Sequence, residues 1–230
     1  FVVHTHPVSV NGLTCALGGR SVAERLFPEA LWMPYVDPGY TLCMAVRKAV
    51  EAYRARHGKE PNILFLENHG VFVSGDTEAD IREAYGQIME NLRTAYAAVG
   101  VKGTVAVGAD PDEAAVADWH QTLREAFGAA AAAVAGSGSF DVGTGPISPD
   151  QIVYAKSYPF EGVLTVENLL AFKAERGYVP RVVVTDRAVL GVGATQKAAG
   201  LALALALDGA QVKVLAKAFG GVRYLSDAAR

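Results

Sequence analysis

The chain has few cysteines and no large excess of positive or negative charge. Each of these two features excludes a class of protein. Only two of its 230 residues are cysteine, Cys15 and Cys43, and they form neither a C-x-x-C pair nor a disulfide framework. The 21 lysines and arginines nearly balance the 24 aspartates and glutamates, so the formal net charge is only −3. We therefore expect a reduced, cytoplasmic, globular protein with no nucleic-acid partner and no membrane partner.

Targeting signals and long apolar runs are missing as well. No basic region or small-residue cleavage site lies near Phe1, so we expect no signal peptide. The Ala- and Leu-rich run Ala198–Ala206 is too short to span a bilayer and predicts a buried helix. The chain starts inside an expected strand and stops just after an expected helix start at Ser226-Asp227. We therefore expect a fragment of a longer protein.

The remaining pattern predicts a mixed α/β fold. Apolar runs and turn residues predict strands over residues 1–6, 63–66 and 71–73. A helix is expected from Thr41 to about His57, where Gly58 ends it, and another from Thr77 to about Val99. Residues 110–135 are expected to be mainly helical, and the Gly- and Ser-containing segment that follows, residues 136–146, is the best candidate for an interdomain linker.

Two histidines at a strand end and a third one later form the main candidate site. His4 and His6 are separated by one residue, and on an extended strand such side chains point to the same face. A lone pair of this kind is more often structural than metal-binding. His69 follows the strand 63–66 and precedes a glycine, which lets the backbone pass close. The three imidazoles together favour a metal site with an open position.

Other polar groups carry weaker hypotheses. Glu67 lies two residues before His69, and it is either a general base near the metal or a carboxylate that orients a ligand imidazole. His57 and His120 lie in helical contexts and are expected to contact a helix dipole or solvent. Gly191-x-Gly193 lacks the third glycine of a dinucleotide-binding loop, so we expect no nucleotide cofactor.

Residues 181–217 repeat the pattern of residues 63–99. Both segments have the order strand, polar corner, short strand, Gly-x-Thr and long helix, and they align without a gap. His69 aligns with Arg187, and no His-x-His motif precedes the second copy. Because arginine keeps its proton, it is not a metal ligand. The second copy is therefore expected to be a metal-free relative of the first.

Three motifs resemble the class II aldolase/adducin family. They are Val3-His4-Thr5-His6-Pro7, Pro34-Tyr35-Val36-Asp37-Pro38-Gly39, and residues 67–77 (ENHGVFVSGDT). The resemblance covers roughly residues 1–100. The C-terminal half, with Ser148–Gln151 and Phe219–Gly221, is similar to the extension of rhamnulose-1-phosphate aldolase/dehydrogenase bifunctional proteins. That likeness implies a dehydrogenase domain beyond Arg230.

The resemblance implies a fold, a cofactor and a reaction. The fold is a three-layer α/β/α domain with a central, mainly antiparallel sheet, followed by a second, degenerate α/β module. His4, His6 and His69 carry over as ligands of Zn²⁺. Zinc in such enzymes polarises the carbonyl of a ketose 1-phosphate and stabilises the enediolate left by retro-aldol cleavage. The products are dihydroxyacetone phosphate and an aldehyde, and the enzymes are cytoplasmic homotetramers.

Two departures from the family keep alternatives open. The acid/base glutamate is expected upstream of Phe1, so Glu67 is only a weak candidate for this role, and the family's tyrosine acid has no clear counterpart. Epimerisation or dehydration of a sugar phosphate is therefore an alternative reaction, and turnover by this chain alone is in question. A non-catalytic, adducin-like scaffold is the weaker alternative, because a scaffold need not keep three histidines.

The predicted domain organisation is linear. Residues 1–109 are expected to be the metal-binding domain, truncated at its N-terminus. Residues 110–146 are expected to be a helix with a Gly- and Ser-rich linker. Residues 147–230 are expected to be a C-terminal α/β extension that includes the metal-free repeat.

Overall fold

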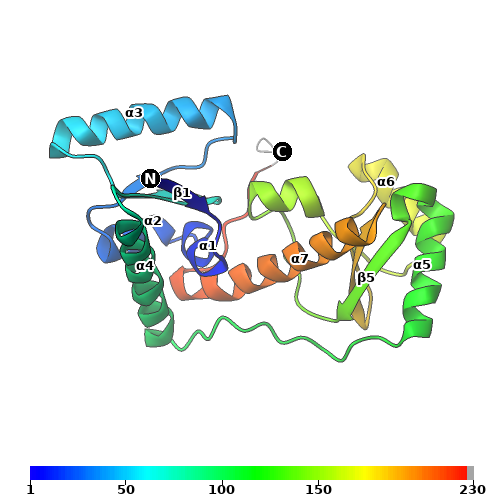
Figure 1. The fold of residues 1–230 in the computed structure, drawn as a ribbon. Helices are drawn as coiled ribbons and strands as arrows, with labels where there is room; N and C mark the ends of the chain where they lie inside the picture. Colours follow the sequence, from blue (N-terminus) through cyan, green and yellow to red (C-terminus); the bar gives the residue numbers. More distant parts are fainter. Residues whose placement is uncertain (227–230) are drawn as a thin grey trace. The chain divides into compact units, whose positions relative to one another are not determined.

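The computed structural model describes residues 1–226, which form two compact units (Figure 1). Of the described residues, unit 1 contains Phe1–Thr104, Ile147–Pro149 and residues 211–226, and unit 2 contains Val105–Pro146 and Asp150–Ala210. The first change of unit lies close to the predicted boundary at residue 109. The prediction of three consecutive segments does not include the return of residues 147–149 and 211–226 to unit 1. Asp227, part of the expected last helix start, lies outside the described residues.

Unit 1 contains a four-stranded mixed sheet with the strand order β1-β4-β3-β2. Strands β1 and β3 pair antiparallel with β4, and β2 pairs parallel with β3, so the sheet is mainly antiparallel as predicted. The strands are β1 (Val2–Thr5), β2 (Leu31–Met33), β3 (Ile63–Leu66) and β4 (Gly70–Ser74). The helices are α1 (Val8–Thr14), α2 (Gly19–Leu26), α3 (Tyr40–His57) and α4 (Glu78–Ala98).

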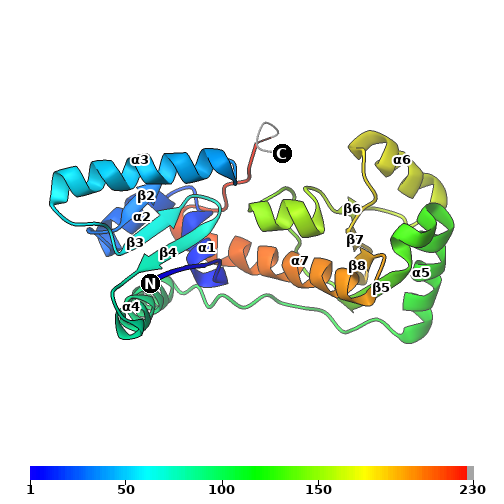
Figure 2. The ribbon, with the colours of Figure 1, turned by 45° about the horizontal axis from the view of Figure 1, so that its top comes forward.

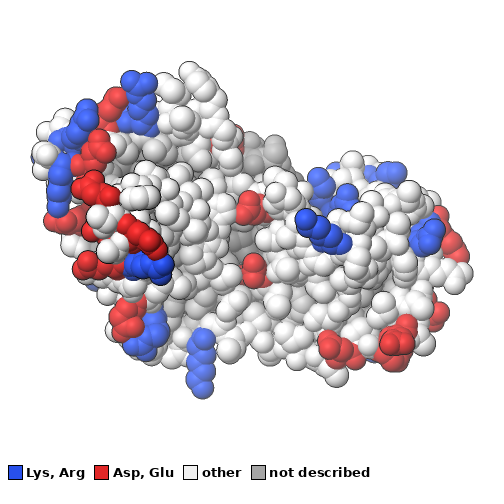
Figure 3. All heavy atoms as spheres, in the orientation of Figure 1, with Lys and Arg blue, Asp and Glu red and all other residues white. Residues whose placement is uncertain are grey.

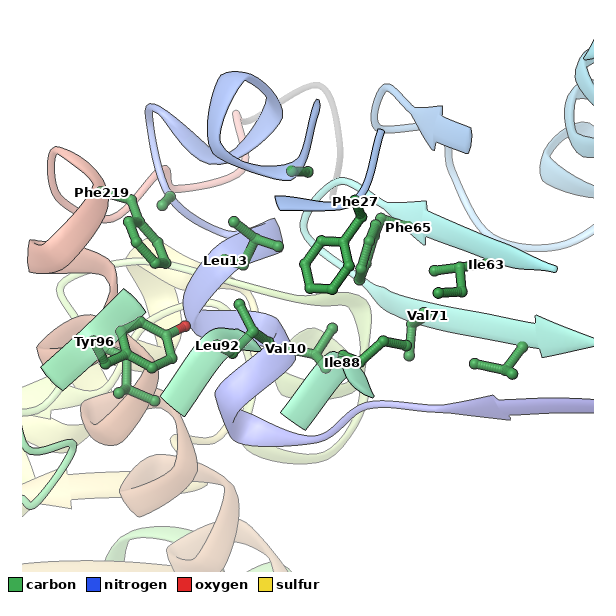
Figure 4. Close-up of a cluster of buried hydrophobic side chains, with 14 of the residues drawn as sticks. Val10, Leu13, Phe27, Ile63, Phe65, Val71, Ile88, Leu92, Tyr96 and Phe219 are labelled. Carbon is green, nitrogen blue, oxygen red and sulfur yellow. The ribbon is translucent and has the colours of Figure 1, made fainter. Parts of the chain in front are cut away.

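The two faces of this sheet pack against different helices, because side chains alternate along each strand. In β4, Val71 and Val73 join the cluster formed with α1, α2 and α4 (Figure 4). Phe72 packs on the opposite face, where α3 contributes Leu42 and Val46. Figure 2 shows α3 on one side of the sheet and α4 on the other. The predicted three-layer α/β/α architecture is therefore confirmed for unit 1.

The helix boundaries of unit 1 follow local sequence signals. Asp80 N–H donates to the Thr77 hydroxyl and Thr77 N–H donates to the Asp80 carboxylate, which forms a capping box at the start of α4. Gly58 ends α3 with a left-handed φ of 71°. Helix α1 packs against α4. Gly12 permits its close packing, since a Cβ at that position would lie 2.5 Å from the Tyr96 hydroxyl.

Unit 2 has the same strand order and pairing, β5-β8-β7-β6 with one parallel and two antiparallel pairs. This correspondence agrees with the repeat read from residues 63–99 and 181–217, and α4 and α7 both contain 21 residues. The strands are β5 (Ala133–Gly138), β6 (Phe160–Glu161), β7 (Val182–Val184) and β8 (Ala188–Gly193). The helices are α5 (Glu113–Phe127), η1 (Gly128–Ala131), η2 (Gln151–Ala155) and α6 (Val166–Arg176). Helix α7 (Gln196–Ala216) and the short η3 (Lys217–Phe219) lead back into unit 1.

The predicted linker is wrong for residues 136–138, which belong to strand β5 and pair with β8. Gly138 serves close packing and not flexibility. A Cβ at Gly138 would collide with the carbonyl oxygen of Gly108, whose own N–H donates to the Ser139 carbonyl at 2.8 Å. A glycine-rich composition is typical of both a linker and a tightly packed strand.

Helix α7 is longer than the apolar run that predicts it. With η3 it spans Gln196–Phe219, and its length and composition suffice to cross a membrane. The run Ala198–Ala206 therefore predicted the helix but underestimated its length. A core helix of a water-soluble protein meets the same criteria, so one such helix is weak evidence for a membrane span. Its buried residues recur every three or four positions, as on one helix face: Ala199, Ala202, Ala206 and Ala210.

The charged side chains are mixed in sign. On the face drawn in Figure 3, lysines and arginines lie among aspartates and glutamates, and many of them belong to α3 and α4. Several form exposed pairs within one helix, such as Arg47 with Glu51 at 3.0 Å. Exposed pairs of this kind contribute little to stability. The mixed surface agrees with the near balance of charge in the sequence.

The two cysteines are unpaired, and we expect them to differ in reactivity. Burial raises the pKa of the Cys15 thiol to about 12, although a hydrogen bond from Thr14 opposes the shift. Cys43 is exposed. Because the thiolate is the reactive form, iodoacetamide at mildly alkaline pH should modify Cys43 and spare Cys15 until the protein unfolds. Peptide mass spectrometry with and without denaturant measures this, and equal labelling of both in the native protein would contradict the burial of Cys15.

Candidate metal centre

The end of β1 and the β3–β4 corner bring the three candidate histidines together. Strand β1 pairs with β4 so that His4 lies opposite Phe72. His69 lies in the turn between β3 and β4, directly before Gly70. The ligand nitrogens of His4, His6 and His69 lie within 4.8 Å of one another. Three neutral imidazoles at this separation can hold a divalent metal ion.

The imidazole of His4 is oriented by its surroundings. Its ring stacks on Phe72, with 4.0 Å between ring centroids and 15° between planes. Its Nδ1 lies 3.0 Å from the carbonyl oxygen of Val71. Because a carbonyl oxygen only accepts, Nδ1 carries the proton and Nε2 keeps its lone pair. This is the arrangement that fixes the tautomer of metal-binding histidines in proteins.

The Nε2 atoms of His4 and His6 are 2.9 Å apart. Two nitrogen lone pairs at this distance repel each other unless a proton or a cation lies between them. In a tetrahedral zinc site with ordinary Zn–N bonds, two ligand nitrogens lie about 3.3 Å apart. A small opening of the His4–His6 pair would therefore give coordinating geometry. The donor set fits a zinc ion.

Gly70 permits the close approach of the two strand ends. A Cβ at this position would lie 2.5 Å from Cδ2 of His6 and 2.5 Å from the carbonyl oxygen of Thr5. The glycine after His69 is therefore a steric requirement for the cluster. His4 is exposed, whereas His6 and His69 are more enclosed, so one side of the cluster is open to solvent. This side can admit a further ligand.

The residue before His69 has an unusual backbone conformation and was not identified as a site residue from the sequence. Asn68 has a φ of 55°, in the left-handed region, and its side chain is fully buried. Its Nδ2 donates to the carbonyl oxygens of Ile147 and Arg223, both at 2.8 Å. The available signal was the Asn-His-Gly order, since asparagine tolerates the left-handed region. Its two acceptors are too distant in sequence to be predicted.

Glu67 has a neighbour that neither sequence-based hypothesis anticipated. Its carboxylate lies 4.0 Å from Nε of Arg223, and its N–H donates to the carbonyl of Met33 at 2.9 Å. The guanidinium of Arg223 also donates to the carbonyl of Leu17 at 3.1 Å. Glu67 is thus placed beside a cation from the C-terminal segment of unit 1.

The remaining candidates have structural surroundings. His57 stacks on Tyr53 in the last turn of α3, with 4.2 Å between ring centroids. His120 Nε2 lies 3.2 Å from the carbonyl oxygen of Ala131, so it is not simply solvated as expected. Gly191 and Gly193 lie within β8, where a Cβ at either position would collide with α7. These glycines serve helix packing.

The corresponding corner of unit 2 has no histidine. Val71 and Val189 correspond in the gap-free alignment, and they pair with Thr5 and Ser137 respectively. Gly136, Gly138 and Arg187 therefore stand where unit 1 has His4, His6 and His69. The segment at Gly108 packs directly against Gly138, and Arg187 lies 5.6 Å from the ring of Trp119. This replacement supports our proposal that unit 2 is a metal-free relative of unit 1.

A family of known proteins shares this part of the chain. The family model described as Class II Aldolase and Adducin N-terminal domain matches residues 1–99. These residues contain β1–β4 and the three histidines. The resemblance read from the motifs is therefore confirmed for residues 1–99, and it supports an enzyme with an aldolase-type or related function.

A curated relative carries a similar segment. It is an uncharacterized oxidoreductase, YuxG, from Bacillus subtilis (strain 168), and it is 31% identical over 77 residues. The aligned segment is 33% of this chain and 10% of the relative, so the chain spans about a tenth of that protein's length. No solved structure matches the chain.

Proposed function

We propose that the chain is the aldolase part of a zinc-dependent lyase, which cleaves a ketose 1-phosphate to dihydroxyacetone phosphate and an aldehyde. One observation carries this proposal: His4, His6 and His69 converge within 4.8 Å in a domain that matches the class II aldolase and adducin family. The three residues would hold the metal, with one side of the cluster open to substrate.

The residues around the cluster prepare it for this role. The bond from His4 to the Val71 carbonyl directs Nε2 toward the other imidazoles. Gly70 leaves space for the ring of His6. When bound, zinc supplies a Lewis acid that polarises the substrate carbonyl and stabilises the enediolate. The ordered donors keep the reorganisation needed for metal binding small.

The acid/base group is the less complete part of the proposal. By resemblance it is a glutamate upstream of Phe1. Within residues 1–226, Glu67 is the candidate, and its carboxylate is 18% exposed and lies 4.0 Å from Nε of Arg223. The acid/base group decides which reaction follows at the metal. Epimerisation or dehydration of a sugar phosphate is therefore the alternative proposal.

The resemblance also supports a cytoplasmic homo-oligomer, a tetramer, that acts on a small sugar phosphate. The near balance of charge in the sequence favours no nucleic-acid or membrane partner. A tetrameric mass by light scattering would support this assembly. A monomeric mass over a range of concentrations would contradict it.

Two measurements test the proposed function. Elemental analysis after reconstitution with zinc should give one tightly bound ion per chain, and absence of any divalent metal would contradict the catalytic proposal and favour the scaffold. A coupled assay for dihydroxyacetone phosphate, with a panel of ketose 1-phosphates, tests the reaction. An epimeric sugar phosphate as the product would instead identify an epimerase.

A further inference from the structure

Asn68 connects the corner that carries His69 to two chain segments outside the family-matched residues 1–99. We propose that Asn68 is a positioning residue of the metal centre, which orients His69 by binding the backbone at Ile147 and Arg223. The inference rests on the proposed function, because it requires that His69 binds a metal.

The hydrogen bonds of Asn68 allow its amide a single orientation. A side-chain amide has two N–H donors on Nδ2, and the two carbonyl acceptors both lie 2.8 Å from this atom. Turning the amide over would direct its oxygen at both carbonyl oxygens. Because the side chain is fully buried, water cannot replace the lost bonds. The amide is therefore a fixed link between three segments of unit 1.

The backbone around Asn68 is held as firmly as its side chain. Asn68 N–H donates to the carbonyl of Thr14 at 3.0 Å, and His69 N–H donates to the carbonyl of Leu66 at 3.1 Å. The left-handed φ of 55° sets the direction in which the chain continues into His69. Asparagine tolerates this conformation better than most residues other than glycine, and the two side-chain bonds hold it there.

The segments that accept these bonds are themselves anchored. Ile147 is 2% exposed and packs with Cys15 and Val212. Arg223 N–H donates to the carbonyl of Cys15, and Leu17 N–H donates to the carbonyl of Gly221 at 2.9 Å. The acceptors therefore cannot follow the amide if the corner shifts. Through the amide of Asn68, the fixed positions of these two carbonyls determine the position of His69.

Two substitutions separate this role from general packing. Asn68→Asp keeps the shape and the tolerance for a left-handed backbone, but it replaces the donor with an acceptor that faces two carbonyls. Asn68→Gly keeps the backbone conformation accessible and removes the amide. Asn91→Asp is the matched control, because the amide of Asn91 donates to the carbonyl of Leu26 at 3.4 Å within the same unit.

The measurements are zinc affinity by chelator competition and the visible absorption spectrum of the cobalt-loaded protein. Each is made at a temperature at which circular dichroism shows the metal-free variant to be folded. We expect both Asn68 variants to lose about 10- to 100-fold in affinity, as for other residues that orient metal ligands. Their cobalt spectra should also change. Asn91→Asp should match the unsubstituted protein in both.

The outcomes distinguish this inference from the proposed function. If both Asn68 variants bind cobalt with unchanged affinity and spectrum, the positioning role is overturned and the proposed function stands. If the unsubstituted protein binds neither zinc nor cobalt, the proposed function fails first. If Asn68→Asp does not fold, the result for Asn68→Gly decides.

Discussion

Replacing His69 by alanine is expected to weaken metal binding by the purified protein strongly. His69 supplies one of only three imidazoles in the cluster. A structural zinc site binds with about 10–16 kcal/mol shared among four ligands, so one ligand accounts for roughly 2.5–4 kcal/mol, or about 70- to 900-fold in affinity. Isothermal titration with zinc measures the loss.

The matched control for this prediction is His57→Ala. It removes the same side chain from the same unit, but from a ring that stacks on Tyr53 in α3. Zinc affinity should be unchanged in this variant. Unchanged zinc affinity in His69→Ala would show that another residue is the third ligand, and the proposed donor set would then be wrong.

Replacing Phe219 by alanine should destabilise unit 1 by about 3–5 kcal/mol, the usual cost of deleting a buried aromatic ring. Phe219 is 7% exposed, and its ring centroid lies 5.0 Å from that of Tyr96. It belongs to the same buried cluster as Leu13 and Leu215. The C-terminal segment is therefore part of the core that supports the histidine corner.

Each unit contains one of the two tryptophans, and this allows unit 1 to be followed alone. With Trp119→Phe as the background, the fluorescence of Trp32 reports urea unfolding of unit 1. Phe1→Ala is the control, because Phe1 is 74% exposed and its loss should cost little. Equal effects of Phe219→Ala and Phe1→Ala would show that the C-terminal segment is not part of the core of unit 1.

The parts of the fold that depend on local signals could be predicted from the sequence. Helix α4 starts at Thr77 because the capping residues lie within one turn. His4 and His6 share a strand end, and the motif around His69 follows the next predicted strand. The alternation of residues in these strands specifies their faces. Fold class and the histidine cluster therefore follow from short segments.

The parts that depend on distant contacts could not be predicted. The Gly- and Ser-rich residues of β5 are sheet because they pair with β8, at least 50 residues later in the chain, and the segment at Gly108 packs on Gly138. The return of the chain to unit 1 at Gln211 has no local signal, since α7 continues without a break. The contact of Glu67 with Arg223 likewise joins segments that only the folded chain brings together.

Unit 1 is built from three segments that are far apart in the sequence, so its parts are synthesised at different times. The two carbonyls that bind Asn68 belong to residues made 79 and 155 positions later. At about 5–20 residues per second, the second of them leaves the ribosome roughly 8–30 s after Asn68. All three histidines are present throughout this interval, but the anchor of their corner is not. The anchor of the histidine corner is thus completed only after residues 105–146 and 150–210 of unit 2 have been made.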